Sequence, residues 1–110
     1  MAAEKASIMA QALGLADLLT YQDGAVISRT LIDKKVGTIT VFAFAEGEGL
    51  SEHTAPFDAF VQIIDGTAEV TIAGVDHTVE AGQFIILPAN QPHALRAQTH
   101  FKMLLVMIRA

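Results

Sequence analysis

Short β-rich segments follow one another through most of this chain, and no helical pattern separates them. Residues 25–108 consist of runs rich in Val, Ile, Thr and Phe, each bounded by Gly, Pro, Asn or Asp. Parallel strands need long and usually helical connections, so this succession favours an antiparallel sandwich or barrel. We expect strands at residues 25–32, 36–45, 56–64, 67–73, 75–79, 84–87, 93–97 and 101–108.

Three dipeptides predict where the chain reverses direction. Asp65-Gly66 is typical of a tight hairpin, because both central residues of such a turn take positive φ, which Gly adopts freely and Asp tolerates. Ala73-Gly74 and Ala81-Gly82 indicate two further reversals.

Two of the expected strands are apolar on both of their faces. Residues 39–44 and 103–108 carry apolar side chains at odd and even positions alike, so both faces of these strands must be covered. Only 17% of the chain is charged, compared with about 25% in an average soluble domain. We therefore predict a homodimer, with residues 26–32 as the candidate for a strand exchanged between the two copies.

The first 24 residues differ from the rest. Ile8, Ala12, Leu15 and Leu19 recur at helical intervals, which predicts one short helix over residues 4–19. Gly14 is the position least suited to that helix. A chain of 110 residues accommodates one domain, so we expect residues 1–24 to be a helix and lead-in, and residues 25–110 to be a single all-β barrel.

Charge and composition exclude several classes of partner. The net charge is −5 and the seven Lys and Arg residues are scattered, which argues against nucleic acid. No stretch approaches the roughly 20 apolar residues of a membrane helix, and the first residues lack the continuous apolar core of a signal peptide. There is no cysteine, which is compatible with a reducing compartment. We expect a cytoplasmic protein with no membrane partner.

Histidine and glycine recur at fixed intervals in two stretches. Residues 47–66 match every spacing of the motif G-x5-H-x-H-x3-E-x6-G, with His53 as its first His. Ala55 and Ala59 stand where that motif has its second His and its Glu. Residues 82–97 match G-x5-P-x-G-x2-H-x3-N through Gly82, Pro88 and His93, with Asn90 and Ala97 in place of the inner Gly and the Asn.

Through these two motifs, residues 25–110 resemble the cupin family. The resemblance implies a double-stranded β-helix, the cupin jelly-roll barrel of the RmlC-like type. It also implies an interior site, where metal-binding cupins hold a divalent ion with three His and one Glu. Of those four ligands, only His53 and His93 are present in this sequence.

The spacing of the first motif also has a direct geometric meaning. Positions 53, 55, 57 and 59 share parity, so on one continuous strand their side chains point to the same side. We expect His53, Ala55 and Ala59 to face one way, and the resemblance to metal-binding cupins implies that this side is the barrel interior. Phe57 is expected in the core or at the mouth of the pocket.

The missing carboxylate limits the metal chemistry available to this site. Two His and one carboxylate form the face expected of non-haem iron oxygenases, and Ala59 cannot supply the carboxylate. Three roles stay open for His53 and His93. They are neutral imidazoles hydrogen-bonded in a pocket, ligands of a divalent metal ion such as Zn, Fe, Mn or Ni, or acid-base groups that titrate near pH ~6.5.

Methyl groups in place of two polar ligands leave a more apolar and roomier interior, which suits an organic ligand with one polar group. We therefore expect a small-molecule-binding protein. The residues expected to contact the ligand are His53, His93, Ala55, Ala59, Phe57 and Met103. The alternative is a metal-dependent enzyme, an oxygenase or isomerase, and a structural or regulatory module whose own side chains fill the pocket is a third reading.

Overall fold

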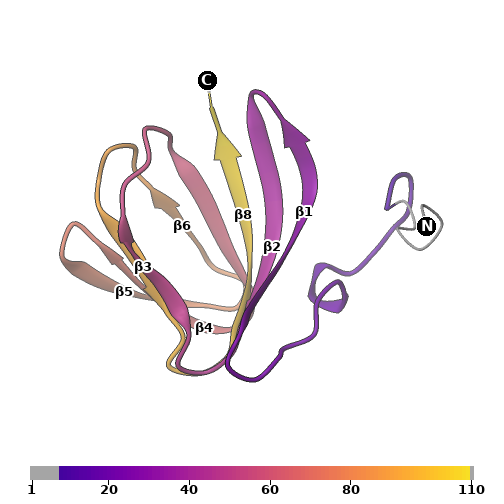
Figure 1. Ribbon diagram of the computed structural model, residues 1–110, viewed down its shortest axis with the longest axis horizontal. Helices are drawn as coiled ribbons and strands as arrows, with labels where there is room; N and C mark the ends of the chain where they lie inside the picture. The colour runs from indigo at the N-terminus through magenta and orange to yellow at the C-terminus, as the bar shows by residue number, and fades with distance from the viewer. Residues whose placement is uncertain (1–7, 110) are drawn as a thin grey trace.

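Antiparallel pairing arranges the chain into two curled sheets that face each other (Figure 1). The computed structural model describes residues 8–109. Its elements are the 3-10 turn η2 (Leu15–Asp17) and the strands β1 (Val26–Lys34), β2 (Gly37–Phe44), β3 (Gly49–His53), β4 (Ala59–Ile72), β5 (Val75–Glu80), β6 (Phe84–Leu87), β7 (His93–Arg96) and β8 (Phe101–Ile108). The all-β expectation is confirmed.

β4 belongs to both sheets. Its first half lies between β8 and β6 in sheet A, which has the strand order β1-β2-β8-β4-β6. Its second half lies between β5 and β7 in sheet B, which has the order β5-β4-β7-β3. One strand therefore joins the two halves of the barrel.

The tight hairpin predicted at Asp65-Gly66 is wrong. β4 runs through both residues, and its register against β8 shifts between Ile63 and Asp65. Of the dipeptide only Gly66 has positive φ, at +76°, whereas a tight hairpin of this kind needs positive φ at both central residues. The outcome is a bulge that bends β4 from sheet A into sheet B. By contrast, Ala73 and Gly74 both have positive φ and form the predicted reversal into β5.

The strand predicted from residue 56 begins at Ala59 instead. A separate strand that the sequence did not predict, β3, ends at His53, and residues 54–58 connect the two. Pro56 lies in this connection, where its missing N–H leaves no ladder hydrogen bond unmade. His53 and Ala59 therefore do not share one strand, and the parity argument that placed them together is wrong.

Within residues 8–109, the helical element is the three-residue turn η2 and not the longer helix expected over residues 4–19. Residues 4–7 of that expected helix lie outside the described residues. Gly14 precedes η2 in an extended conformation, with φ −82° and ψ 127°, and helical propensity alone does not hold so short a segment helical. The lead-in is tied to sheet A by hydrogen bonds from Tyr21 Oη to Asp65 (2.5 Å) and from Lys102 Nζ to the Ala16 carbonyl (2.6 Å).

The inner faces of the two sheets enclose the hydrophobic core. The rings of Phe44 and Phe101 stack with their centroids 4.4 Å apart and are fully buried. Several residues of this core also line an interior cavity, namely Ala59, Val61, Leu87, Leu95 and Met103. Among residues 8–109, no helix has the length and apolar character needed to cross a membrane.

Candidate functional site

The two motif histidines are cross-strand neighbours in sheet B. His53 ends β3, His93 begins β7, and the two are register partners in the antiparallel ladder. Partners of this kind project their side chains from the same face of a sheet. The ring centroids lie 4.4 Å apart and the Nε2 atoms 3.1 Å apart. His93 is 5% exposed, whereas His53 is open to solvent.

Hydrogen bonding constrains the protons of this pair. His53 Nδ1 lies 2.8 Å from the Ser51 carbonyl and His93 Nδ1 lies 3.2 Å from the Gln91 carbonyl. A carbonyl only accepts, so both Nδ1 atoms must donate, which leaves an Nε2 lone pair on each neutral ring. Two neutral imidazoles carry two N–H groups in total, and both are used by the two carbonyl contacts. The third contact, between the two Nε2 atoms, therefore has no proton of its own. The Nε2 contact is satisfied by a third, shared proton or by a metal cation that both Nε2 atoms bind.

The surroundings of His93 disfavour its protonated form. Burial lowers the pKa of His93, and the neighbouring His53 lowers it further by charge repulsion, while the hydrogen bond to the Gln91 carbonyl acts in the opposite direction. His93 is therefore the member of the pair that the barrel holds neutral.

A cavity of about 110 Å³ opens beside the two imidazoles. Its wall contains both histidines together with Ala55, Ala59 and Met103, all expected from the sequence. Phe57 does not line it but faces a separate hollow on the outside of sheet A, because residues 54–58 form a connection and not a strand. For scale, an apolar cavity of roughly 150 Å³ holds benzene, so a ligand enclosed here is a small one.

The remaining wall of the cavity is apolar, and the sequence analysis did not assign these residues to the site. These residues are Leu50, Val61, Leu87, Leu95, Leu105 and Met107. Alternation offered a signal for three of them, because Leu105 and Met107 share parity with Met103 on β8, and Val61 shares parity with Ala59 on β4. No sequence signal identified the leucines of β3, β6 and β7.

Two connecting segments meet at the side of this cavity. The Asn90 amide donates to the Ala55 carbonyl at 2.7 Å, and the Ala89 amide donates to Asp58 Oδ1 at 2.8 Å. Asn90 has φ +65°, a region that Asn enters more readily than most residues. Asn90 can therefore take the place of the inner Gly of the second motif without breaking the turn.

The side chains present do not fit the four-ligand metal centre of the family. Within residues 8–109, no group of three or more His, Cys, Asp or Glu side chains is placed to hold a metal ion. Methyl groups of Ala55 and Ala59 occupy the other two ligand positions. The ligands that remain are the two imidazoles, whose Nε2 atoms lie 3.1 Å apart.

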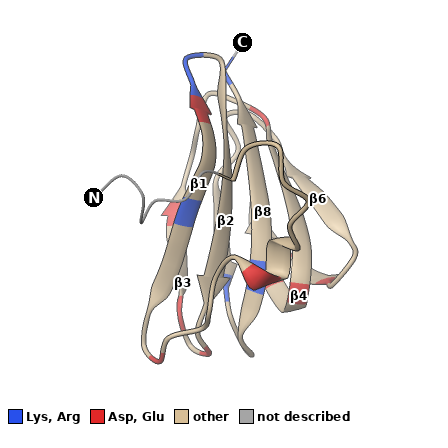
Figure 2. Cartoon of the chain, turned by 90° about the vertical axis from the view of Figure 1, so that its right-hand side faces the viewer, with Lys and Arg blue, Asp and Glu red and all other residues tan. Residues whose placement is uncertain are grey.

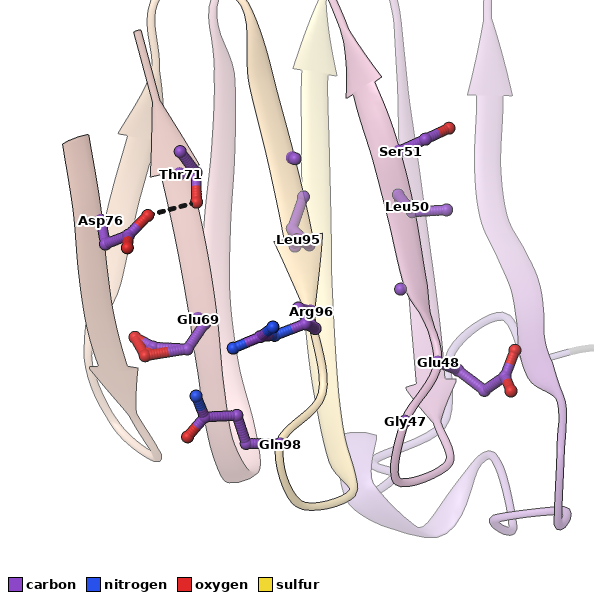
Figure 3. Close-up of a pocket in the computed structure, with 12 residues that line it drawn as sticks. Gly47, Glu48, Leu50, Ser51, Glu69, Thr71, Asp76, Leu95, Arg96 and Gln98 are labelled. Carbon is purple, nitrogen blue, oxygen red and sulfur yellow. Dashed lines mark hydrogen bonds between the residues drawn. The ribbon is translucent and has the colours of Figure 1, made fainter. Parts of the chain in front are cut away.

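A second, larger hollow of about 480 Å³ lies on the outer face of sheet B (Figure 3). Glu69, Thr71, Asp76 and Arg96 project into it from β4, β5 and β7. Two of its carboxylates are already engaged, because the Thr71 hydroxyl donates to Asp76 at 2.6 Å and the Thr78 hydroxyl donates to Glu69 at 2.7 Å. This groove is a solvated sheet face, and the interior cavity is the better candidate for a site.

Several solved structures are similar to this chain in sequence and fold. A conserved protein of unknown function from Streptococcus pyogenes is 39% identical with a TM-score of 0.88, covering 92% of this chain and 89% of that one. A cupin 2 conserved barrel domain protein from Leptotrichia buccalis is 37% identical with a TM-score of 0.82, covering 84% of this chain and 45% of that one. A cupin superfamily protein from Desulfitobacterium hafniense is 28% identical with a TM-score of 0.87, covering 92% and 93%.

A search of curated proteins found no match. The family model of the cupin domain matches residues 40–109, which include both histidine motifs and all strands from β3 to β8. The two curled antiparallel sheets are accordingly the cupin jelly roll expected from the motifs. On this match and on its structural relatives, the chain belongs to the cupin family.

Proposed function

We propose that this protein binds a small organic molecule in the barrel interior, with His53 and His93 as the polar anchors. The observation that carries this proposal is the pairing of two converging imidazoles with an otherwise apolar cavity of about 110 Å³. Apolar walls with a few convergent polar groups are typical of small-molecule sites. The cavity also counts against the structural-module reading, which requires side chains to fill this space.

The ligand expected from these walls is compact, with one polar group at the histidines and a short apolar body among the leucines and methionines. The absence of cysteine agrees with a cytoplasmic setting, which we include in the proposal.

Thermal unfolding in the presence of small ligands tests this proposal. The probes are C2 to C5 carboxylates and the matching alcohols, added to protein treated with a chelator. A ligand at about 100 times its Kd raises the free energy of unfolding by about 2.7 kcal/mol. The shift should disappear in His53→Ala and persist in His77→Ala, because His77 is exposed on β5. If no probe shifts the wild type, or if the His53 variant keeps the shift, the proposed anchors are wrong.

A second candidate is a divalent-metal-dependent cupin enzyme, an oxygenase or isomerase. It is favoured by the tautomers, because both Nδ1–H groups donate to carbonyls and leave both Nε2 atoms available as ligands. His53 and His93 would hold the ion, and water or substrate oxygen atoms would have to complete its shell. A metal bound there would supply Lewis-acid or redox chemistry.

The pH dependence of binding separates the two candidates. Imidazole must be neutral to coordinate a metal, so Zn²⁺ affinity measured by calorimetry should weaken as the pH falls through the imidazole range. An organic anion should instead bind more tightly over the same range, since protonation adds positive charge. Zn²⁺ binding that is lost in both His53→Ala and His93→Ala, with no response to organic probes, would select the metal candidate.

A further inference from the structure

The hydrogen bonds of the two imidazoles also restrict the polar group that the cavity can bind. Both Nδ1 atoms face backbone carbonyls, that of His53 at 2.8 Å from Ser51 and that of His93 at 3.2 Å from Gln91. A carbonyl only accepts, so in two neutral rings each Nδ1 carries the proton and each Nε2 carries a lone pair. Two hydrogen-bond acceptors therefore face each other across 3.1 Å at the edge of the cavity.

Two acceptors this close together can share one donor group. A nitrogen atom placed beside the pair can lie within about 2.9 Å of both Nε2 atoms, which is the usual length of a hydrogen bond from nitrogen. In the ligand-free protein a shared proton meets the need of the pair for a donor. In a complex, a ligand group that donates two hydrogen bonds from one nitrogen can take the place of that proton.

The wall of the cavity carries no fixed charge. Among residues 8–109, no Asp, Glu, Lys or Arg side chain lines it. Charged residues are also sparse over β2, β8 and β6 (Figure 2), and the last two of these strands carry cavity-lining side chains. A bound anion would therefore have no permanent cation beside it. The net charge of −5 on the whole chain instead favours the approach of a cation.

Common polar groups differ in how well they fit two lone pairs. A carboxylate only accepts hydrogen bonds, so it would face both Nε2 atoms with no proton between them. An alcohol has one O–H and satisfies one Nε2 atom. A primary ammonium has three N–H groups, of which two can reach the Nε2 atoms. The third can reach water, because His53 is open to solvent.

We propose that the ligand of this cavity is a short-chain primary amine, bound as its ammonium ion with N–H groups donated to Nε2 of His53 and of His93. This inference rests on the proposed function and names the chemical class of its ligand. The volume of about 110 Å³ limits the apolar body to roughly three to five carbon atoms. That body lies among Val61, Leu105 and Met107, away from the ammonium group.

NMR titration with a matched series of probes tests this ligand class. Butylamine, butanol, butyrate and butyltrimethylammonium share one apolar chain and differ in the polar group. They are added to chelator-treated protein at about pH 8 in a buffer without primary amines, where an unperturbed imidazole is neutral and an alkylamine is charged. Butylamine should have a dissociation constant at least roughly 10-fold below that of butanol, because two charge-assisted hydrogen bonds replace one neutral bond. Butyrate and the trimethylammonium ion should bind more weakly than butanol, and the latter keeps the positive charge without any N–H group.

Variants and the order of the four affinities separate this inference from the proposed function. His53→Ala removes one of the two acceptors and should abolish most of the preference for butylamine over butanol, whereas His77→Ala on β5 should retain that preference. Binding of butyrate or of the trimethylammonium ion as tightly as butylamine would overturn the ligand class and leave interior binding standing. Failure of all four probes to bind would overturn both proposals.

The hydrogen-bond premise has a test that needs no ligand. NMR of the imidazole nitrogens in the ligand-free protein at about pH 8 should show His53 and His93 with the proton on Nδ1 and with Nε2 unprotonated. Signals that place the proton on Nε2 of both rings would overturn the inference, because the site would then present two donors to its ligand.

Discussion

At the scale of single residues, Ala55 and Ala59 decide what the histidine pair can do. Both methyl groups line the cavity beside the imidazoles, although only Ala59 lies on a strand. The family's two missing ligands can therefore be restored by side chains alone. We expect Ala55→His with Ala59→Glu to raise Zn²⁺ affinity strongly, measured by calorimetry.

The cost of this double variant is added volume in a small cavity, which is expected to lower the free energy of unfolding by about 1 to 3 kcal/mol. Adding His53→Ala to the double variant should remove the gained affinity. A folded double variant with no gain in Zn²⁺ affinity would show that the two positions do not converge on the histidines.

The lowered pKa of His93 predicts how the stability of the metal-free protein depends on pH. In the unfolded chain this His titrates near pH ~6.5, so below that pH the unfolded state binds more protons than the folded state. The free energy of unfolding should then fall as the pH is lowered from ~6.5 through the folded-state pKa. Urea titrations between pH 7.5 and pH 5 measure this slope. His93→Gln should reduce it, and His77→Gln should leave it unchanged.

At the scale of secondary-structure elements, the bulge in β4 depends on one glycine. Gly66 has φ +76°, and an added Cβ would contact the backbone of β8. Gly24 has a similar φ of +69° with no atom within 4 Å of an added Cβ. Chemical denaturation should show Gly24→Ala to be destabilised by about 1 to 2 kcal/mol, the conformational cost alone, and Gly66→Ala by clearly more. Equal losses would mean that close packing at the bulge contributes nothing.

The same strand shows how far the sequence predicts this fold. Alternation and turn residues correctly predicted an all-β chain and most strands, because hydrophobic periodicity is a local property. The path of β4 was not predicted, because Asp65-Gly66 suits both a hairpin and a bulge, and only pairing with the distant strand β8 selects between them. The 3-10 turn in place of a longer helix has a similar cause, since contacts of Tyr21 with Asp65 and Lys102, and of Ala16 with Lys102, hold the lead-in against the barrel.

The candidate site was predicted in part for a related reason. Fixed motif spacings located both histidines and both alanines even though the strand parity used to orient His53 was wrong. The leucines of the cavity wall carry no motif, and their convergence depends on how the two sheets close. Phe57 was assigned to the pocket because the connection at residues 54–58 was read as strand.

At the scale of the whole molecule, β4 links the cavity to the outer face of sheet A. Ala59 and Val61 face the cavity, whereas Phe60 between them faces outward. Changes that enlarge the cavity at residues 59 or 61 therefore act on the backbone that carries Phe60.

The unequal exposure of the two imidazoles gives the cavity a direction. His53 is open to solvent, whereas Val61, Leu87 and Met103, which also line the cavity, are at most 3% exposed. A ligand bound as proposed enters with its apolar body first and keeps its polar end at the opening. Groups added to the ligand should then be tolerated only at its polar end, which lies at the opening. A resin that carries the ligand through a linker at its polar end should retain the protein, and a resin linked through the apolar end should not.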